Sequence, residues 1–217
     1  MSLIALAGNP NVGKSTLFNA LTGRNQHTGN WPGKTVELAQ GRCQYKGEEI
    51  QIVDLPGAYS LVSRSPEEQV AEDFLRSGGA DCTVAVCDAT CLERSLILVL
   101  QVLTLSPRTV VCVNLMDEAA HRNIQVDLIR LSRALGVPVI GTTARKKHSL
   151  FELSEALDQL LDGIFLFFRV HHAVLCGFGR YGNNVDTLGD MQLSGLAVAQ
   201  SVIIVHTISN IAALLGL

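Results

Sequence analysis

The sequence lacks the features that mark several common classes of protein. Its net charge of -3 and isoelectric point near 6.0 leave no excess of basic residues for binding nucleic acid through charge alone. Its six cysteines follow no disulfide or zinc-binding spacing, which is typical of reduced thiols in the cytosol. The first predicted strand follows Met1 at once, so we expect no room for a cleaved signal peptide. At 217 residues, the chain is long enough for one α/β domain with an appended segment.

The segment 8–15, Gly-Asn-Pro-Asn-Val-Gly-Lys-Ser, has the phosphate-loop pattern of a glycine, four residues and Gly-Lys-Ser. It lies between an apolar run at 3–7, which reads as a buried strand, and a helix-like segment at 16–21. Glycines let successive backbone N–H groups surround a phosphate, and the amino end of the helix adds partial positive charge. We expect Lys14 on the β- and γ-phosphates and the Ser15 hydroxyl on Mg²⁺. The plainer alternative is a glycine-rich turn with a surface lysine.

Strand and helix signals alternate along the rest of the chain. A polar stretch at 22–34 is predicted to be a long loop, and such loops inside a compact domain are usually functional. Expected strands lie at 36–45, 48–53, 82–87, 109–113 and 139–141, and expected helices at 65–76, 92–103, 127–135 and 149–161. These elements predict an α/β domain over residues 1–164, with a mostly parallel central sheet flanked by helices.

Three residues are candidates for contacts around a triphosphate and Mg²⁺. Asp54 ends a predicted strand, where α/β proteins place ligands, and is positioned to hold Mg²⁺ through water. The Gly57 N–H, three residues on, can meet a γ-phosphate. Thr35, in the predicted loop after the first helix, is the candidate for a second hydroxyl ligand of Mg²⁺. Taken singly, Asp54 also reads as an ordinary turn acid.

A later group of residues predicts the identity of the base. Asp117, after the predicted strand 109–113, can accept hydrogen bonds from N1–H and the exocyclic amine of guanine, a donor pair that adenine lacks. A site built around such bonds rejects a ligand that leaves them unpaired. Asn114 would tie this segment to the phosphate loop, and the Ala144 N–H can meet the guanine O6. Singly, these residues are also common as caps and in turns, but their order favours GTP or GDP as ligand. The predicted fold is that of a P-loop NTPase of the Ras-like GTPase kind.

The candidate site residues form three sets. Those expected to bind nucleotide are Gly8, Asn9, Pro10, Asn11, Val12, Gly13, Lys14, Ser15, Thr16, Gly33, Thr35, Asp54, Gly57, Asn114, Asp117, Thr143 and Ala144. The expected Mg²⁺ ligands are Ser15, Thr35 and Asp54. The catalytic candidates are Asn11, Lys14, Thr35 and Gly57.

Five segments resemble the cytosolic G domain of the ferrous iron transport protein B family. They are the phosphate loop, 29–37 (Gly-Asn-Trp-Pro-Gly-Lys-Thr-Val-Glu), 54–57 (Asp-Leu-Pro-Gly), 86–94 (Val-Cys-Asp-Ala-Thr-Cys-Leu-Glu-Arg) and 114–117 (Asn-Leu-Met-Asp). The second and fourth segments are much more specific than general GTPase motifs. The resemblance covers residues 1–162, with departures from the usual family residues at Lys34 and Cys91.

The resemblance implies a GTPase that regulates Fe²⁺ uptake, with loops that change shape between GTP and GDP. It also implies turnover stimulated by K⁺, with Asn11 as a potassium ligand. Because Ala58 follows Gly57, the side-chain amide that orients water in many small GTPases is absent, and a cation beside Asn11 can replace an inserted arginine. The implied location is the cytoplasmic face of the inner (plasma) membrane, beside a permease. Assembly into a homo-oligomer is possible, and no nucleic-acid partner is expected.

Two other functions stay open at this stage. A ribosome-associated assembly GTPase would bind RNA, but the acidic isoelectric point and the lack of an appended basic module weigh against it. The other is a scaffold that binds nucleotide without hydrolysing it.

Single residues outside the nucleotide motifs allow further predictions. Cys82 and Cys87, in an apolar strand, are expected to be buried thiols. A metal site at His171, His172 and Cys176 is the less favoured interpretation of those residues, and Trp31 reads equally well as a partner anchor or a lid.

Residues 165–217 differ in composition from the predicted domain. No charged residue occurs from Met191 to Leu217, and a helix of that length would extend about 40 Å, enough to cross a hydrocarbon layer of about 30 Å. Polar residues such as Gln200, His206 and Asn210 make it a poor span. A membrane segment, a helix packed on the domain and a disordered end of a truncated product are all open.

Overall fold

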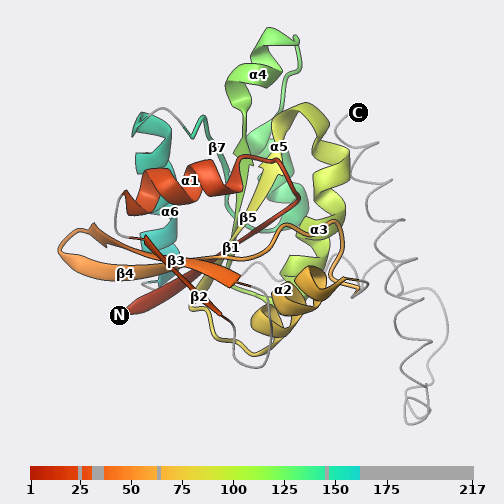
Figure 1. Cartoon of the computed structure of the whole chain (residues 1–217). Coiled ribbons are helices and arrows are strands. Elements are labelled where there is room, and N and C mark those ends of the chain that lie inside the picture. Colours follow the sequence, from red (N-terminus) through yellow and green to blue (C-terminus); the bar gives the residue numbers. More distant parts are fainter. Residues whose placement is uncertain (24–25, 31–36, 63–64, 145–146, 162–217) are drawn as a thin grey trace, which may run out of the picture.

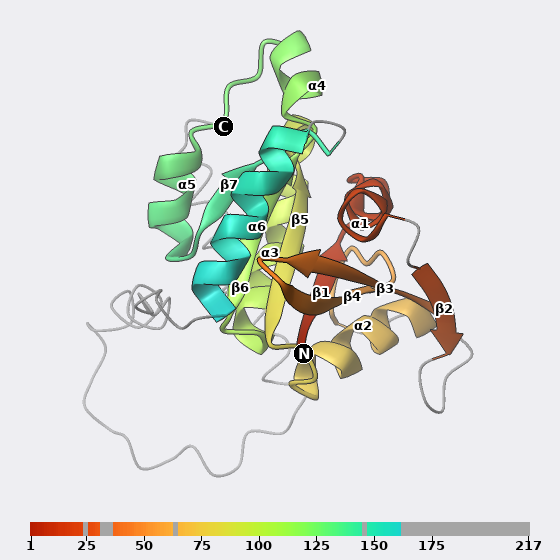
Figure 2. The same ribbon diagram turned by 90° about the vertical axis from the view of Figure 1, so that its left-hand side faces the viewer.

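The computed structural model of the protein describes residues 1–23, 26–30, 37–62, 65–144 and 147–161. Within these ranges the chain forms one seven-stranded sheet with helices on both faces (Figures 1 and 2). The strands are β1 (Ser2–Gly8), β2 (Gln26–Asn30), β3 (Glu37–Tyr45), β4 (Glu48–Asp54), β5 (Cys82–Asp88), β6 (Thr109–Asn114) and β7 (Val139–Gly141). The helices are α1 (Lys14–Thr22), α2 (Pro66–Arg76), α3 (Leu92–Leu105), preceded by the 3₁₀ turn η1 (Ala89–Cys91), α4 (Met116–His121), α5 (Leu128–Leu135) and α6 (Lys147–Leu161).

Strand β1 occupies the middle of the sheet, whose order is β2-β3-β4-β1-β5-β6-β7. It pairs in parallel with β4 and β5, so that Ile4 faces Ile52 on one side and Cys82 on the other. Strands β5, β6 and β7 continue the parallel arrangement, whereas β2, β3 and β4 are joined in antiparallel pairs. The prediction of a mostly parallel sheet is confirmed. The two edge strands, β2 with five residues and β7 with three, are the shortest of the described strands.

The core consists of two apolar layers, one on each face of the sheet. Helices α2, α3 and α5 cover one face, where Phe74, Leu96 and Leu131 pack together with the strand residues of that side. Helices α1 and α6 cover the other face through residues such as Phe18 and Leu153 (Figure 2). Parallel strands are apolar along their whole length because helices cover both of their faces, which explains the continuous apolar runs in the sequence.

Local signals in the sequence set several helix boundaries. The Ser65 hydroxyl accepts a hydrogen bond from the Glu68 N–H at 3.2 Å, and Pro66 occupies the first position of α2. Asp127 caps α5 in the same way through the Arg130 N–H at 2.9 Å, and Gly136 ends that helix in the left-handed conformation. These predicted boundaries are confirmed.

Three elements differ from the sequence-based prediction. The prediction of an unbroken loop over 22–34 is wrong, because residues 26–30 form β2, which pairs with β3. The short helix α4 was not predicted, and it stands out beyond the carboxyl ends of the strands (Figures 1 and 2). Helix α6 begins at Lys147, two residues before the predicted start.

In the part of the chain that the structure describes, no helix has the length and apolarity needed to cross a membrane. The predictions for residues 165–217 lie outside the described residues.

Candidate nucleotide-binding site

The candidate site lies where the parallel strands end. Strands β1, β4, β5, β6 and β7 all run in one direction, and their carboxyl ends meet at one edge of the sheet. The phosphate loop follows β1, Asp54 closes β4, and Asn114 closes β6. Segments that are far apart in the sequence are thus gathered at the edge where α/β folds bind ligands.

The phosphate loop has a backbone shape that depends on its glycines. Asn11 and Gly13 both have positive φ, at 67° and 81°. A Cβ atom on Gly13 would lie 2.4 Å from Nδ2 of Asn114, and one on Gly8 would lie 2.7 Å from the Val86 carbonyl oxygen. Side chains are therefore excluded at both glycines, and the backbone of the loop packs directly against the ends of β5 and β6.

Lys14, Ser15 and Asp54 form a connected polar cluster. The Lys14 ammonium is paired with the Asp54 carboxylate and donates to the Leu55 carbonyl oxygen at 2.5 Å, with only 8% of the residue exposed. The Ser15 hydroxyl donates to the other carboxylate oxygen of Asp54 at 3.2 Å. A hydroxyl and a carboxylate side by side are the hard oxygen ligands that Mg²⁺ prefers, so these residues fit a magnesium ion.

The segment around Gly57 packs directly on the phosphate loop. A Cβ atom on Gly57 would lie 3.1 Å from the Pro10 nitrogen and 3.2 Å from its Cα. The Ala58 N–H donates to the Gly8 carbonyl oxygen at 3.2 Å. This contact keeps the Gly57 backbone beside the loop that is predicted to hold phosphate.

Asn114 joins the phosphate loop to the segment after β7. Its Nδ2 atom donates to the Val12 carbonyl oxygen at 3.0 Å. Its Oδ1 atom accepts from the Thr142 hydroxyl and from the Ala144 N–H, both at 3.1 Å. The amide is fully buried, so breaking these bonds would leave a polar group unpaired in the interior.

A small pocket of about 70 Å³ opens beside Asn114. Its lining residues are Gly13, Thr16, Asn114, Leu115, Asp117, Glu118, Thr143 and Ala144. Most of these were predicted to bind nucleotide. Leu115 and Glu118 were not: Leu115 lies within the 114–117 motif but was given no role, and Glu118 follows that motif. Leu115 has a left-handed backbone with φ 62°, which turns the chain from β6 into α4.

Two residues of this pocket differ from the simplest expectation. Asp117 does not follow the strand directly but lies in the first turn of α4, where its carboxylate accepts from the Glu118 N–H at 3.1 Å. The Ala144 N–H, predicted to meet a guanine O6, donates to Asn114 here. It would therefore have to share or leave that bond to contact a base.

The side-chain amide of Asn9 is buried, with 4% of the residue exposed. Neither its oxygen nor its nitrogen has a hydrogen-bond partner among the described residues. Buried polar groups in proteins are nearly always paired, so an orphaned amide within a phosphate loop is consistent with a ligand that completes the site. Asn11 is exposed at the surface of the same loop.

Several predicted residues lie outside the described part of the structure. Among them are Gly33, Thr35, the departure at Lys34 and the loop residue Trp31. The candidate metal residues His171, His172 and Cys176 are also outside it. Within the described residues, no group of three or more His, Cys, Asp or Glu side chains is arranged to hold a metal ion.

The cysteines of the sheet are thiols shielded from water. Cys82, Cys87 and Cys112 are buried, and burial raises the pKa of Cys82 and of Cys112 to about 12. The pKa of Cys87 is also raised by burial. Thiols with such pKa values stay protonated near neutral pH and ligate metals poorly, so the prediction of buried thiols at Cys82 and Cys87 is confirmed.

Comparison with known proteins identifies the family. A family model described as ferrous iron transport protein B matches residues 2–157. The chain belongs to the ferrous iron transport protein B family. It is 42% identical over 160 residues to the Fe(2+) transporter FeoB of Escherichia coli K12, which covers 72% of this chain and 21% of the relative. The chain thus spans about a fifth of the length of the curated relatives it matches.

Two solved structures extend the comparison. The G domain of the T. maritima FeoB iron transporter is 42% identical, covers 74% of this chain and 98% of its own, and superimposes with a TM-score of 0.70. The cytosolic domain of the same transporter in a GMPPNP form is 30% identical, covers 98% of both chains and has a TM-score of 0.82. The G-domain fold predicted from the sequence is confirmed.

Proposed function

We propose that the chain binds GTP and hydrolyses it to GDP and phosphate. The observation that carries this proposal is Asn114, which joins the phosphate loop to the pocket containing Asp117. A triphosphate on the loop and a base in the pocket would then occupy one continuous site. The T. maritima domain that the chain resembles is known in GDP and GMPPNP forms, which supports the proposal.

Phosphate binding is proposed to use the backbone of the loop together with Lys14. The backbone N–H groups of Asn9 and of residues 11–14 and the amino end of α1 favour an anion, whereas Pro10 has no N–H to donate. Lys14 is held by Asp54 and Leu55 in this structure, so its ammonium reaches a phosphate by exchanging these partners. Bound Mg²⁺ would neutralise phosphate charge, with Ser15 and Asp54 as its ligands and Thr35 as the further candidate.

Base selection is proposed to rest on the Asp117 carboxylate. It lines the pocket from α4, with Thr143 and Ala144 as neighbouring wall residues. A carboxylate accepts two hydrogen bonds from guanine and finds no such donor pair on adenine, so ATP would leave it unpaired.

Hydrolysis is proposed to depend on the Gly57 N–H, on Thr35 and on a cation beside Asn11. Ala58, which is buried against the phosphate loop, has no side chain that can orient water. A potassium ion held by the exposed Asn11 would supply the positive charge that an arginine supplies in other GTPases, where its effect is worth about three to five decades in rate.

The role in the whole protein follows from the family. We infer that the domain lies at the cytoplasmic face of the inner membrane and regulates Fe²⁺ movement through a permease. Its loops would couple the nucleotide state to that permease, and assembly into a homo-oligomer is compatible with this role.

Single-turnover hydrolysis with Mg²⁺ tests the proposal directly. GTP should be cleaved faster in potassium than in sodium chloride, and ATP should be a poor substrate. Asn11→Ala should remove the difference between the two salts, whereas Lys14→Ala should abolish nucleotide binding through the loss of charged phosphate contacts. Equal binding of GTP and ATP would overturn the proposal. Equal hydrolysis rates in both salts would refute only the proposed role of the potassium ion.

The rival function, a ribosome-associated assembly GTPase, has no observation in its favour. Co-sedimentation of the chain with ribosomal particles, dependent on GTP, would be the result that revives it.

A further inference from the structure

The segment 58–62 connects the candidate phosphate site to helix α3. At its start, the Ala58 N–H bonds to the phosphate loop, and three residues later Leu61 is buried in the core layer of α2 and α3. Tyr59 and Val62 are exposed, at 45% and 42%. The segment therefore has a fixed end at the phosphate loop and a fixed point on the side of α3.

Gln101 of α3 bonds to this segment through both ends of its side-chain amide. Its Oε1 atom accepts from the Leu61 N–H at 2.7 Å, and its Nε2 atom donates to the Ser60 hydroxyl oxygen at 3.1 Å. The same hydroxyl oxygen accepts from the Val62 N–H at 3.1 Å, which tightens the turn. An amide with one donor end and one acceptor end is the side chain that this pair of partners requires.

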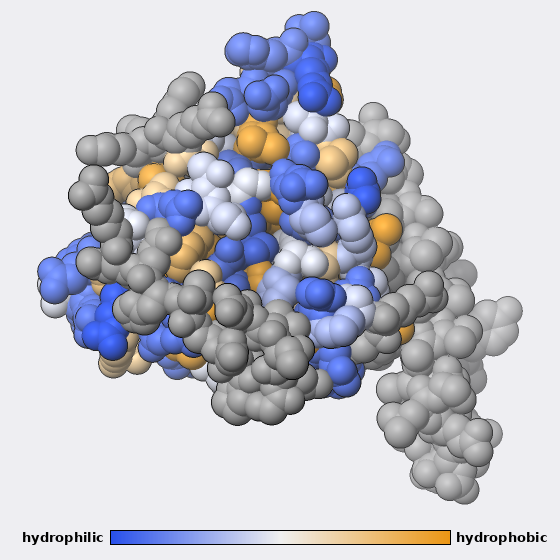
Figure 3. All heavy atoms as spheres, viewed as in Figure 1, coloured by the Kyte–Doolittle hydropathy of each residue, from blue (hydrophilic) through white to orange (hydrophobic). Residues whose placement is uncertain are grey.

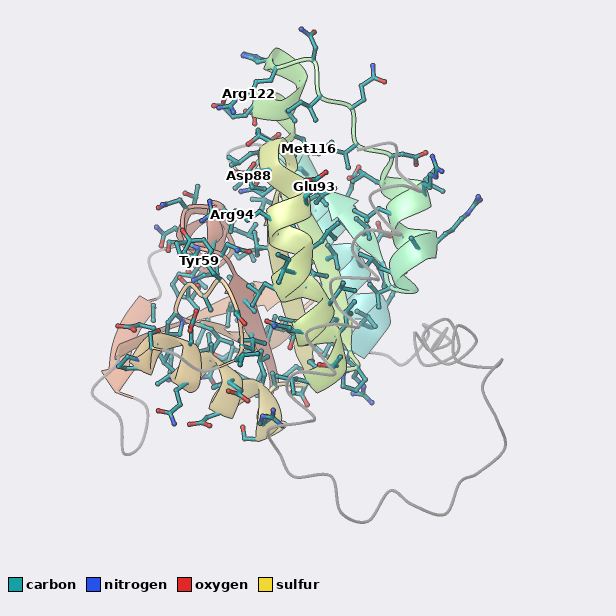
Figure 4. The ribbon with its side chains drawn as sticks, turned by 90° about the vertical axis from the view of Figure 1, so that its right-hand side faces the viewer. Tyr59, Asp88, Glu93, Arg94, Met116 and Arg122 are labelled. Carbon is teal, nitrogen blue, oxygen red and sulfur yellow. The ribbon has the colours of Figure 1, made fainter. Side chains whose placement is uncertain are left out.

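Arg94, on the same helix, contacts the segment as well. Its guanidinium lies over the Tyr59 ring, 4.3 Å from the ring centre, and the two side chains come together in Figure 4. Arg94 and Gln101 are seven residues apart, or about two helical turns, so they lie on one face of α3. One face of one helix therefore holds residues 59–61 at two separate points.

We propose that Gln101 is a positioning residue for GTP hydrolysis, a role that rests on the proposed GTPase function. Its two hydrogen bonds hold residues 60 and 61, and through them the backbone of Gly57 beside the phosphate loop. The Gly57 N–H is the group predicted to meet a γ-phosphate, which GTP has and GDP lacks. Gln101 thus favours the triphosphate without touching it.

The test is Gln101→Met in the whole chain, which keeps the side-chain length and removes both hydrogen bonds. Affinity for GMPPNP should fall about three- to tenfold, because the binding energy must then also order the segment, while GDP affinity stays unchanged. Single-turnover hydrolysis of GTP should slow as well. Ser60→Ala removes one of the two Gln101 bonds, together with the bond from the Val62 N–H to the same hydroxyl, and should also lower GMPPNP affinity more than GDP affinity. In the double variant the two effects should not add, because they share a bond.

Gln51→Met is the matched control. Gln51 is also half-buried and donates to Gln40 at 3.2 Å, but in the β3–β4 pair. It should leave the ratio of GMPPNP to GDP affinity unchanged. Equal losses for both nucleotides, or no loss for GMPPNP, in a Gln101→Met or Ser60→Ala chain that melts cooperatively would overturn the inference. A wild-type chain that binds no GMPPNP would instead refute the proposed function.

Discussion

Asp117 carries the proposed choice of base at the scale of a single residue. Its carboxylate lines the pocket from the first turn of α4. Asp117→Asn replaces one acceptor oxygen by a donor, which should repel the exocyclic amine of guanine and suit the carbonyl of xanthine. We expect GTP affinity to fall at least about a hundredfold and xanthosine triphosphate to bind better, as measured by calorimetry.

Glu118→Gln is the matched control for Asp117→Asn, since Glu118 is the next residue and lines the same pocket. It should leave base preference intact. Unchanged selectivity in Asp117→Asn would remove Asp117 from base recognition.

Asn9 provides a second prediction at this scale. Its buried amide has no partner among the described residues, which is expected to lower stability by about 1–3 kcal/mol. Asn9→Ala should therefore raise the free energy of unfolding without nucleotide and reduce the rise in Tm that GDP produces. Urea unfolding with and without GDP measures both effects. Gln125→Ala, at an exposed amide, is the control and should change neither. A loss of stability without nucleotide would show that the Asn9 amide is already paired in the free protein.

The sequence predicted where the site residues lie better than it predicted their bonds. Motif spacing was enough to expect Asn114 near the phosphate loop, because both lie at the carboxyl ends of parallel strands, β6 and β1, with only β5 between them. It was not enough to show that the Ala144 N–H donates to Asn114, since that depends on the loop after β7. No pattern in the sequence predicted the contacts of Gln101, because a glutamine on a helix face is ordinarily exposed to solvent.

Helix α2 allows a prediction at the scale of one element. Its amino end is capped by the Ser65 hydroxyl, which accepts from the Glu68 N–H. Ser65→Ala should lower the free energy of unfolding by about 0.5–2 kcal/mol, because that N–H loses its partner. Denaturant unfolding of the two chains would measure the difference.

Ser154→Ala is the matched control for the cap. The Ser154 hydroxyl bonds to the Leu150 carbonyl oxygen inside α6, an interaction that contributes little to helix stability. Equal losses in the two variants would show that the cap contributes nothing of its own.

The elements missed by the sequence analysis lacked the usual signals. Strand β2 has the sequence Gln-His-Thr-Gly-Asn, without alternating apolar residues, and it exists through backbone pairing with β3 at the edge of the sheet. Helix α4 is only six residues long and rich in polar residues, which Figure 3 shows as a hydrophilic projection. Strands and helices that cover the core were predicted because burial imposes a pattern on them.

Chemical labelling of the cysteines can measure unfolding of the whole molecule. Cys91 is exposed, whereas Cys82, Cys87 and Cys112 are buried in the sheet. A short pulse of iodoacetamide at pH 8 should label Cys91 and spare these three, because they are covered and because pKa values of about 12 at Cys82 and Cys112 keep those thiols protonated. Peptide mass spectrometry measures the labelling.

Urea should expose all three buried thiols over one concentration range if the domain unfolds as a unit. Cys91→Ser is the control and should remove the labelled Cys91 peptide while leaving the labelling of Cys82, Cys87 and Cys112 unchanged. Labelling of the three sheet cysteines at the rate of Cys91 without urea would contradict the described core.

The short edges of the sheet bear on how copies of the molecule could associate. A strand at an edge offers unpaired backbone groups to any similar strand that approaches, and a short edge offers few of them. Among the described residues, with five at one border and three at the other, the sheet provides little template for a second copy to extend it. Self-association at high concentration is therefore expected to bury helix or loop surfaces and to add no strands from a second copy to the sheet.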